Sequence, residues 1–595
     1  MNINEILTAS IQQAFQEIFG KKVENIALQA TKKEFEGTHT LVVFPFTKEL
    51  GEKPADIAQK IGNFLVEKCP IVEKFNVVQG FLNISLKKTA WLSLAKQLSE
   101  KKHFSLPAKN LKVVVEYSSP NTNKPLHLGH LRNIFLGFSI SRIFSAFGYK
   151  VHKTQIINDR GIHICKSMLA YELFGKGETP DSSGLKGDHL IGKYYVMFDK
   201  LYKEQMQKLI AEELKEEEAE KRAEAIQKAQ EMLVKWEKGD SQVVELWKKL
   251  NGWVYEGFNA TYAKLGVDFD SVYYESDTYL LGKDIIQEGL EKGIFYKKED
   301  GSVWIDLTAE GLDHKLVLRA DGTSVYITQD LGTADLRYKH QQMDKMIYVV
   351  GNEQDYHFKV LFLILKKLGR SYAEGLYHLS YGMVELPTGK MKSREGTVVD
   401  ADDLIEEVIG LAKAKTLEKM QSAGTEGSFL EAEKEKLFEM IGLGALKYFL
   451  LKIDPHKKML YNPEESVSFE GDAAPFIQYT HARICSVLRK AQESNTNNAS
   501  WETYTDLHPL EISLVYQLSE YANALQSAVE KYAPYILAQY VYELCKIFST
   551  FYAECSILKA ENAEAMQFRL LLCKLTAETI KQGMYLLGIE VPERM

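Results

Sequence analysis

Residues 111–148 read LKVVVEYSSPNTNKPLHLGHLRNIFLGFSISRIFSAFG, and the rest of the chain is organised around them. The three valines at 113–115 predict a buried strand, and a polar loop then leads to an amphipathic helix that HLGH at 127–130 opens. A helix start is typical of an anion site, because its first N–H groups lack intrahelical partners and the peptide dipoles add there. Two imidazoles would reinforce such a site, and Gly129 would let a flat ligand approach the backbone.

A second strand is predicted directly after this helix. Gly148 stands where a helix C-terminal glycine belongs, and residues 149–161, YKVHKTQIINDRG, continue with a strand pattern. Strand, helix and strand in this order predict a βαβ unit and a parallel sheet. Because such sheets bind ligands at the carboxyl ends of their strands, we expect residues 118–130 and 158–161 to meet there. Taken alone, an HxGH pattern more often marks a core helix with two surface histidines, so the remaining sequence must decide.

Length and composition narrow the class of protein. A chain of 595 residues exceeds one hydrophobic core, so several domains are expected. No segment approaches the ~20 apolar residues of a membrane span, and the N-terminus lacks the pattern of a secretory signal, so no membrane partner is expected. The six cysteines are scattered without a CxxC pair, which argues against a structural metal site and favours a cytoplasmic location. The net charge of −8 means that any nucleic acid must bind to a local patch.

The patterns along the chain predict an α/β protein with additional domains. We expect a small α+β domain at 1–105, a Rossmann-like parallel-sheet domain at 106–400, a helical connecting region at 401–474 and an all-α domain at 475–595. Within the second of these, the charged block at 179–250 predicts an insertion of solvated helices, to which the sequence assigns no function.

Shorter patterns place individual elements. The apolar run at 41–46 predicts a strand, and residues 55–68 predict a helix. The glycine of the Gln79-Gly80 pair predicts a turn or a bulge. The Asp321-Gly322 pair stands between two apolar runs and predicts a hairpin turn.

Two short motifs carry a resemblance to a known family. HLGH at 127–130 resembles the His-Ile-Gly-His signature of class I aminoacyl-tRNA synthetases and related nucleotidyltransferases, and GKMKSREG at 389–396 resembles their Lys-Met-Ser-Lys-Ser loop. Within that class the chain most resembles the arginyl-tRNA synthetase family over nearly its whole length. Further marks of this resemblance are EYSSPNTNKPLHLGHLRN at the opening stretch, YITQDLGTA at 326–334, Gln354-Asp355, FIQYTHARICSVLRK at 476–490 and the terminal LLGIEVPERM.

The resemblance implies an activity and its partners. ATP would activate L-arginine to arginyl-adenylate, and the arginyl group would pass to the terminal adenosine of tRNA(Arg). Mg²⁺ would accompany ATP, no metal site of the protein's own is implied, and the enzyme would act as a monomer. The residues implied in catalysis are Lys124, His127, His130, Lys390 and Lys392. Those implied in ATP binding are His127, Gly129, His130, Lys390, Met391, Lys392, Ser393 and Arg394.

The second motif departs from the family pattern. The second lysine of the family loop falls on Ser393 in an ungapped comparison, while a lysine occupies position 392. The resemblance implies that Lys124, three residues before His127, supplies the missing positive charge. The role of Lys392 is therefore open.

Recognition of arginine needs a particular set of side chains. A guanidinium is planar, forked and always charged, so a selective site answers it with carboxylates. The resemblance places Glu116 and Asp330 against the guanidinium with Tyr326 as a hydroxyl acceptor, and Asn121 and Gln354 at the α-amino and carboxylate end. Ser118 and His130 complete the implied arginine site. The alternative is that Glu116 is a surface charge at a strand end and Asp330 caps a helix.

The terminal regions resemble the tRNA-contacting domains of the same family. The C-terminal helices resemble its anticodon-binding domain, and the N-terminal region resembles the domain used against the outer corner of tRNA. Implied tRNA contacts are Tyr479, His481 and Arg483, although polar residues of a domain junction are the simpler interpretation. Two alternatives for the whole chain stay open, a class I ligase for another amino acid and a non-catalytic tRNA-binding paralogue.

Overall fold

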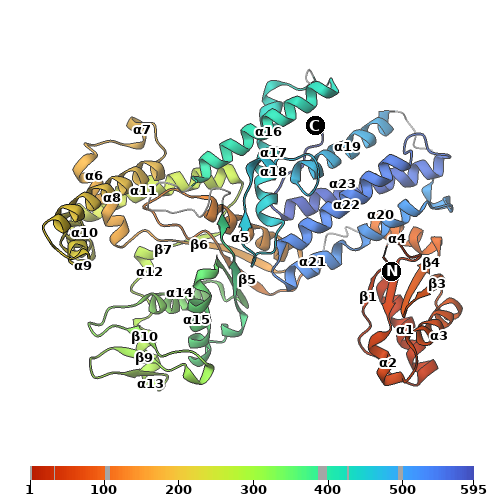
Figure 1. Cartoon of the computed structure of the whole chain (residues 1–595), viewed down its shortest axis with the longest axis horizontal. Coiled ribbons are helices and arrows are strands. Elements are labelled where there is room, and N and C mark those ends of the chain that lie inside the picture. Colours follow the sequence, from red (N-terminus) through yellow and green to blue (C-terminus); the bar gives the residue numbers. More distant parts are fainter. Residues whose placement is uncertain (1–2, 33, 101–106, 386–398, 425–427, 494–499) are drawn as a thin grey trace. The chain divides into compact units, whose positions relative to one another are not determined.

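A computed structural model describes residues 3–32, 34–100, 107–385, 399–424, 428–493 and 500–595 (Figure 1). Contacts divide the chain into two compact units. Unit 1 comprises Met1–His103, Ile484–Ala522 and Glu543–Thr579, and unit 2 comprises Phe104–Arg483, Asn523–Tyr542 and Ile580–Met595. Among the helices of the described residues, none is long and apolar enough to cross a bilayer.

Unit 2 is built on a five-stranded sheet in which every neighbouring pair is parallel. Val113 in the central strand pairs with Lys345 on one side and with Val151 on the other. The strands in sheet order are β12 (Leu376–Tyr381), β11 (Lys345–Gly351), β5 (Lys112–Glu116), β6 (Lys150–Ile157) and β7 (Ser271–Tyr274). The predicted parallel α/β fold is therefore confirmed.

Helix α5 (Leu128–Ala146) connects β5 to β6 as predicted, but it is not amphipathic. It is buried on almost all sides, because α16 (Ala401–Ala423) and α17 (Glu431–Leu451) pack on it in addition to the sheet. Buried polar side chains of α5 form hydrogen bonds with backbone carbonyls of other segments. Arg132 donates to the carbonyls of Gly382, at 2.6 Å, and Lys457, at 3.0 Å. The sequence pattern missed this because helical periodicity reports one covered face and not a second layer of helices.

A second sheet in unit 2 is antiparallel. It has the order β10 (Lys315–Leu318), β9 (Val303–Ile305) and β8 (Phe295–Lys297). Its buried residues share one hydrophobic core with those of α13 (Lys283–Glu291), α14 (Tyr326–Gln341) and α15 (Asp355–Lys367). The hairpin turn predicted at Asp321-Gly322 is only partly right. The turn is present, since Gly322 has φ +77° and its N–H donates to the Arg319 carbonyl at 2.9 Å, but only an isolated bridge joins Leu318 to Ser324, and α14 follows in place of a second strand.

The charged block at 179–250 is helical, and its helices share a core with the sheet domain. Its helices are α7 (Pro180–Ser183), α8 (Gly187–Ala211), α9 (Glu216–Arg222), α10 (Glu224–Glu237) and the first part of α11 (Ser241–Leu265). Tyr194 and Phe198 of α8 are buried, and α8, α10 and α11 all pack on α6 (Ile162–Phe174). The expectation of solvated helices alone was wrong, because the apolar positions are few but fall on the faces that meet α6.

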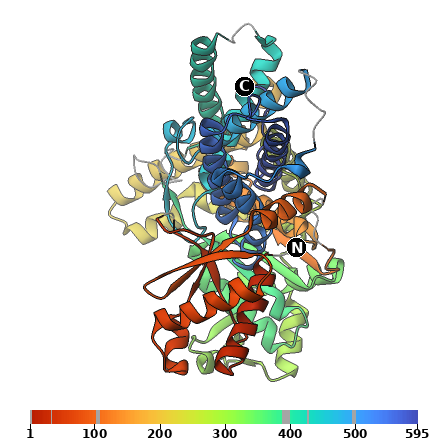
Figure 2. The same cartoon turned by 90° about the vertical axis from the view of Figure 1, so that its right-hand side faces the viewer.

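Unit 1 begins with an antiparallel sheet in the order β1 (Leu28–Ala30), β2 (His39–Val42), β4 (Phe81–Leu86) and β3 (Val72–Val78). Helix α3 (Pro54–Lys68) packs on β3 and β4, and α1 (Ile3–Phe19) packs on α3 (Figure 2). Helix α4 (Lys88–Glu100) packs on α20 (Pro509–Ser519). The helix predicted at 55–68 and the turn at Gln79-Gly80 are confirmed.

The strand predicted at 41–46 is only partly right. Strand β2 ends at Val42, and helix α2 (Phe44–Leu50) starts at Phe44 with a proline in its first turn. Proline is favoured at a helix start and cannot donate to a sheet, so Pro45 ends the strand that its apolar neighbours suggest.

The C-terminal region is helical, in agreement with the predicted fold class. Its helices are α19 (Ala474–Glu493), α20, α21 (Tyr521–Glu530), α22 (Pro534–Glu554) and α23 (Ala563–Leu586). Within unit 1, the buried Arg569 donates to Glu511 at 2.7 Å and to Glu561 at 2.8 Å, which joins α20 to α23.

Candidate active site

The start of α5 holds its two histidines through the backbone. His127 is the N-cap residue, and its Nδ1 accepts the Gly129 N–H at 3.1 Å. His130 Nδ1 accepts the His127 N–H at 3.1 Å, and the two ring centroids are 3.8 Å apart. A nitrogen that accepts from an N–H carries no proton, so each ring has its single proton on Nε2. Two Nε2–H groups are thus preset as hydrogen-bond donors.

Burial keeps these imidazoles neutral. It lowers the pKa of His127 to about 3, with a further contribution from the charge of Lys124. The pKa of His130 also lies well below its usual value because of burial, His127 and Lys124. Burial lowers the pKa of Lys124 as well. At neutral pH the histidines therefore act as neutral donors, and the positive field comes from Lys124 and the helix dipole.

The loops after β5 and β6 meet at the carboxyl edge of the sheet, as predicted. Asn121 forms an isolated parallel bridge with Asn158, and the Thr122 N–H donates to the Asn158 carbonyl at 3.1 Å. Ser118 has φ +60°, a conformation that costs energy for a residue with a side chain. It is held by Asn133 Oδ1, which accepts the Ser118 N–H at 2.6 Å. The strained residue lies where the candidate ligand site begins.

Helix α14 brings acidic and aromatic side chains to the same region. Asp330 lies four residues and Arg337 eleven residues after Tyr326, so the three side chains share one face of α14. Asp330 Oδ2 lies 2.6 Å from Nε2 of His357 in α15. Asp330 is in the second turn, so the alternative that it caps the helix is wrong. Gln354 ends the short 3₁₀ helix η2 (Asn352–Gln354), which follows β11 at the carboxyl edge.

Glu116 is buried in an ion pair with Arg337, so the alternative of a surface charge is wrong. Burial raises the pKa of Glu116, and the charge of Arg337 opposes that shift. The Arg337 guanidinium lies 5.2 Å from the ring centroid of Tyr273 and 5.9 Å from that of Tyr348. The carboxylate of Glu116 is therefore already matched to a guanidinium of the protein itself. Sequence reasoning missed Arg337, although its spacing from Asp330 along α14 was a usable signal.

Glu275 is a second acid that sequence reasoning missed. It is the first residue of α12 (Glu275–Thr278), directly after β7, and is half-buried. Burial raises its pKa to about 7, against the effect of Arg160, and the charges of Asp159 and Asp330 add to the rise. Asp330 is thus close enough to Glu275 for its charge to raise the pKa of Glu275. The available signal was its position at the carboxyl end of a parallel strand.

The insertion helps to hold this edge of the sheet. Trp247 Nε1 of α11 donates to the Asp159 carbonyl at 2.6 Å, and the Tyr255 hydroxyl donates to Asp159 Oδ2 at 2.8 Å. The same carboxylate accepts the Ser276 N–H at 2.8 Å. Asp159 thereby links α11 to the residue that follows Glu275.

The other predicted residues lie elsewhere. Lys390, Met391, Lys392, Ser393 and Arg394 lie outside the described residues. His481 is 2% exposed and its Nδ1 is 2.8 Å from the Pro592 carbonyl, whereas Tyr479 and Arg483 are only half-buried. Among the described residues, Asp188, His189 and Asp402 place metal-ligating atoms within 4.8 Å of one another.

Three family models match this chain. "tRNA synthetases class I (R), catalytic domain" matches residues 93–462, "Arginyl tRNA synthetase N terminal domain" matches residues 3–86, and "DALR anticodon binding domain" matches residues 477–595. The first of these alone covers more than half of the chain.

Similar proteins agree with these matches over full length. The arginine–tRNA ligases of Amoebophilus asiaticus and Flavobacterium psychrophilum are 56% and 54% identical to the chain, with 100% of each protein covered. The solved structure of Thermus thermophilus arginyl-tRNA synthetase is 26% identical and superposes with a TM-score of 0.80 over 100% of both chains. The chain therefore belongs to the arginyl family of class I tRNA synthetases.

Proposed function

We propose that this protein is an arginine–tRNA ligase. Arginine and ATP give enzyme-bound arginyl-adenylate and pyrophosphate, and the arginyl group then passes to the 3′-terminal adenosine of tRNA(Arg). One observation carries the proposal. Along one edge of a parallel sheet, a helix start with two preset Nε2–H donors is combined with the carboxylates of Asp330 and Glu275.

In the activation step, an oxygen of the arginine carboxylate attacks the α-phosphorus of ATP and pyrophosphate leaves with the electron pair of the broken P–O bond. His127 and His130 donate their Nε2–H groups to phosphate oxygens, and Gly129 lets the adenine approach the backbone. Lys124 supplies positive charge where negative charge develops on the phosphates. The proposal also assigns contacts with the triphosphate to Lys390, Met391, Lys392, Ser393 and Arg394.

The arginine side chain is assigned to the acidic group at the same edge. Asp330 and Glu275 pair with the guanidinium, and Tyr326, which is 76% exposed, closes over it. Because Glu116 is already paired with Arg337, we assign it to the surroundings of the arginine site and not to direct contact with the substrate guanidinium. Lysine would leave hydrogen-bond acceptors unpaired, at about 1–3 kcal/mol each. The proposed partners of the α-amino and carboxylate end are Ser118, Asn121, His130 and Gln354.

Mg²⁺ is proposed to enter with ATP, since Mg²⁺ prefers phosphate oxygens and water and keeps few protein ligands. In the described part of the chain, the one group of three metal-ligating residues contains Asp188 and Asp402, and Lys186 already pairs with both. The proposal further includes action as a monomer and a cytoplasmic location, the latter from the scattered cysteines.

The proposed tRNA contacts centre on Tyr479. Its ring lies 4.5 Å from Lys419 Nζ and 4.8 Å from the Arg483 guanidinium. Aromatic rings flanked by cations are typical of surfaces that stack bases and hold phosphates. The buried His481 is assigned a structural role, because its contact with the Pro592 carbonyl holds the C-terminal segment.

Pyrophosphate exchange with arginine, measured with and without tRNA, tests the proposal, together with charging assays for all twenty amino acids. We expect exchange and charging with arginine. A preference for another amino acid would indicate a different class I ligase, and no exchange in either condition would indicate a non-catalytic tRNA-binding paralogue. Lys124→Ala should slow exchange with little change in arginine affinity.

A further inference from the structure

The insertion lies directly against the loop that leads into α5. Gly192 of α8 packs on Pro125, and a Cβ at Gly192 would come within 2.8 Å of Pro125 Cδ. The neighbouring atom in the same contact is the Cα of Lys124, at 3.8 Å. Helix α8 therefore touches the chain between Lys124 and His127, although the sequence assigns it no function.

The start of α16 is joined to the same segment by the backbone. Asp400 is the N-cap residue of α16 and forms an antiparallel bridge with His127. The Leu128 N–H donates to the Val399 carbonyl at 3.2 Å, and the Ala401 N–H donates to the Leu126 carbonyl at 3.0 Å. A displacement of Asp400 would therefore be passed to His127 through the two backbone hydrogen bonds that form this bridge.

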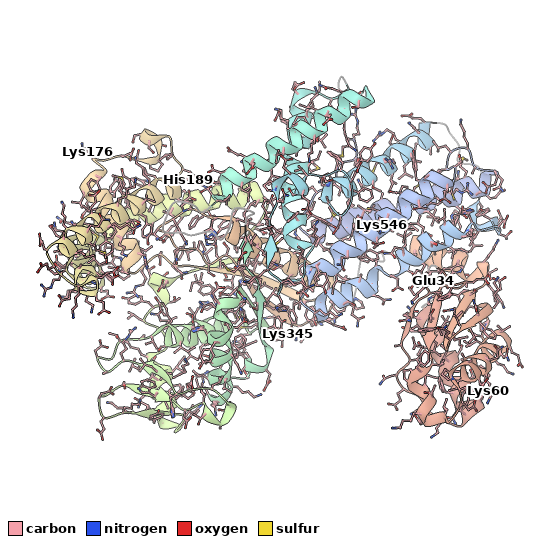
Figure 3. All side chains as sticks on the ribbon, viewed as in Figure 1. Glu34, Lys60, Lys176, His189, Lys345 and Lys546 are labelled. Carbon is pink, nitrogen blue, oxygen red and sulfur yellow. The ribbon has the colours of Figure 1, made fainter. Side chains whose placement is uncertain are left out.

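A cluster of charged side chains ties α8 to the start of α16. His189, labelled in Figure 3, is a residue of α8. Its Nε2 lies 3.3 Å from Asp400 Oδ2 and 3.2 Å from Asp402 Oδ2. Lys186 pairs with Asp402, and its Nζ is 3.3 Å from Asp188 Oδ2. We call these five residues, Lys186, Asp188, His189, Asp400 and Asp402, the α8–α16 ion cluster.

Helix α11 completes the surroundings of the ion cluster. The Thr261 hydroxyl accepts from Lys186 Nζ at 2.6 Å and donates to Asp402 Oδ1 at 3.0 Å. The Asp188 side chain is fully buried against Gly257, where a Cβ would overlap its carboxylate. A buried carboxylate keeps its charge only with a partner, and Lys186 is the cation beside it. The ammonium of Lys186 thus supplies the positive charge that a metal ion would otherwise bring.

We propose that the α8–α16 ion cluster is a positioning device for the activation reaction, which holds His127 and His130 in place through residues 399–401. Lys186 and His189 are positioning residues, because they act through their contacts with Asp402 and, for His189, also with Asp400. This inference rests on the proposed function and gives the insertion a part in it. A displacement of about 1 Å in a group that orients the reactants can cost about 100-fold in rate.

Lys186→Met and Asp402→Asn test the inference, with Lys203→Met as the matched control. Lys203 is on the same helix and pairs with Asp199 away from the cluster. We expect kcat of pyrophosphate exchange to fall about 10- to 100-fold in the two cluster variants, while KM for arginine changes less than about twofold. The fall in kcat of the double variant should be smaller than the product of the falls in the two single variants, because both substitutions remove the same contact between Lys186 and Asp402.

His189 offers a milder test if Lys186→Met does not fold. His189→Ala removes the contact, whereas the amide of His189→Gln can still donate to one carboxylate and should recover most of kcat. A folded Lys186→Met or His189→Ala protein with wild-type kcat would overturn the inference. An equal fall in kcat in the Lys203→Met control would also overturn the inference. A wild-type protein without exchange would instead refute the proposed function, so the two failures are distinguishable.

Discussion

The proposed function divides the candidate site into a nucleotide half, with His127 and His130, and an arginine half, with Asp330, Glu275 and Glu116, and these halves differ in their electrostatics. The nucleotide half keeps His127 and His130 neutral by burial and fixes each ring through its Nδ1. The arginine half keeps several carboxylates close together, at the cost of a raised pKa for Glu275 and an internal guanidinium against Glu116. The difference suits the ligands proposed for each half, because phosphates can be bound by neutral N–H donors whereas a guanidinium needs negative charge.

The halves also differ in what positions their side chains. Backbone hydrogen bonds within four consecutive residues set both histidine rings. The acids come from α14, from the last residue of β5 and from the segment after β7, and the side chains of His357 and Arg337 pair with Asp330 and Glu116. A substitution in the first half should therefore affect the rate, and one in the second half should affect arginine affinity.

The largest effect is expected from His127→Ala. It removes a preset donor to the phosphates, so kcat of pyrophosphate exchange should fall about 10²- to 10³-fold with little change in KM for arginine. His127→Asn is the control, because its amide oxygen can still cap α5 and should restore thermal stability. A rise in KM for arginine as large as the fall in kcat would contradict the division of the site into two halves.

Asp330→Asn should produce the reverse pattern. The loss of a charged partner of the guanidinium should raise KM for arginine about 10- to 100-fold, because such hydrogen bonds contribute about 1.5–3 kcal/mol. KM for ATP should stay within about twofold of the wild type. Steady-state exchange kinetics with each substrate varied in turn provide the measurement, and equal losses for both substrates would refute the role of Asp330.

The pKa of Glu275 predicts how arginine affinity depends on pH. Its carboxyl group has a pKa of about 7, so protonation on going from pH 8 to pH 6 removes one negative charge from the arginine half. KM for arginine should rise as the pH falls, by up to about 10-fold over this range. Glu275→Gln should have a high KM that is flat with pH. A flat profile in the wild type would show that Glu275 does not meet the guanidinium.

The smallest effect is expected from His357→Ala. The 2.6 Å contact with His357 orients the Asp330 carboxylate, so its loss should raise KM for arginine about 2- to 10-fold without changing kcat. His357→Gln keeps a donor at this place and should lie close to the wild type. A loss in kcat alone would place His357 with the nucleotide half instead.

The sequence by itself determined the features that depend on neighbouring residues. The valines of β5, the HLGH start of α5, the turn at Asp321-Gly322 and the meeting of the loops after β5 and β6 all follow from periodicity and turn chemistry. The family followed from short motifs whose order along the chain is specific. These features can be predicted from the sequence because they depend on the backbone geometry of residues close together in the chain.

Only the tertiary structure decided the electrostatics. The neutrality of His127 depends on burial, the pairing of Glu116 with Arg337 joins distant segments, and the cluster of Lys186 with Asp402 joins the insertion to α16. Charge interactions depend on distance and on exclusion of water, and neither can be read from spacing along the chain. The sequence thus indicated which residues lie at the carboxyl edge of the sheet, and the packing around them set their charge and their partners.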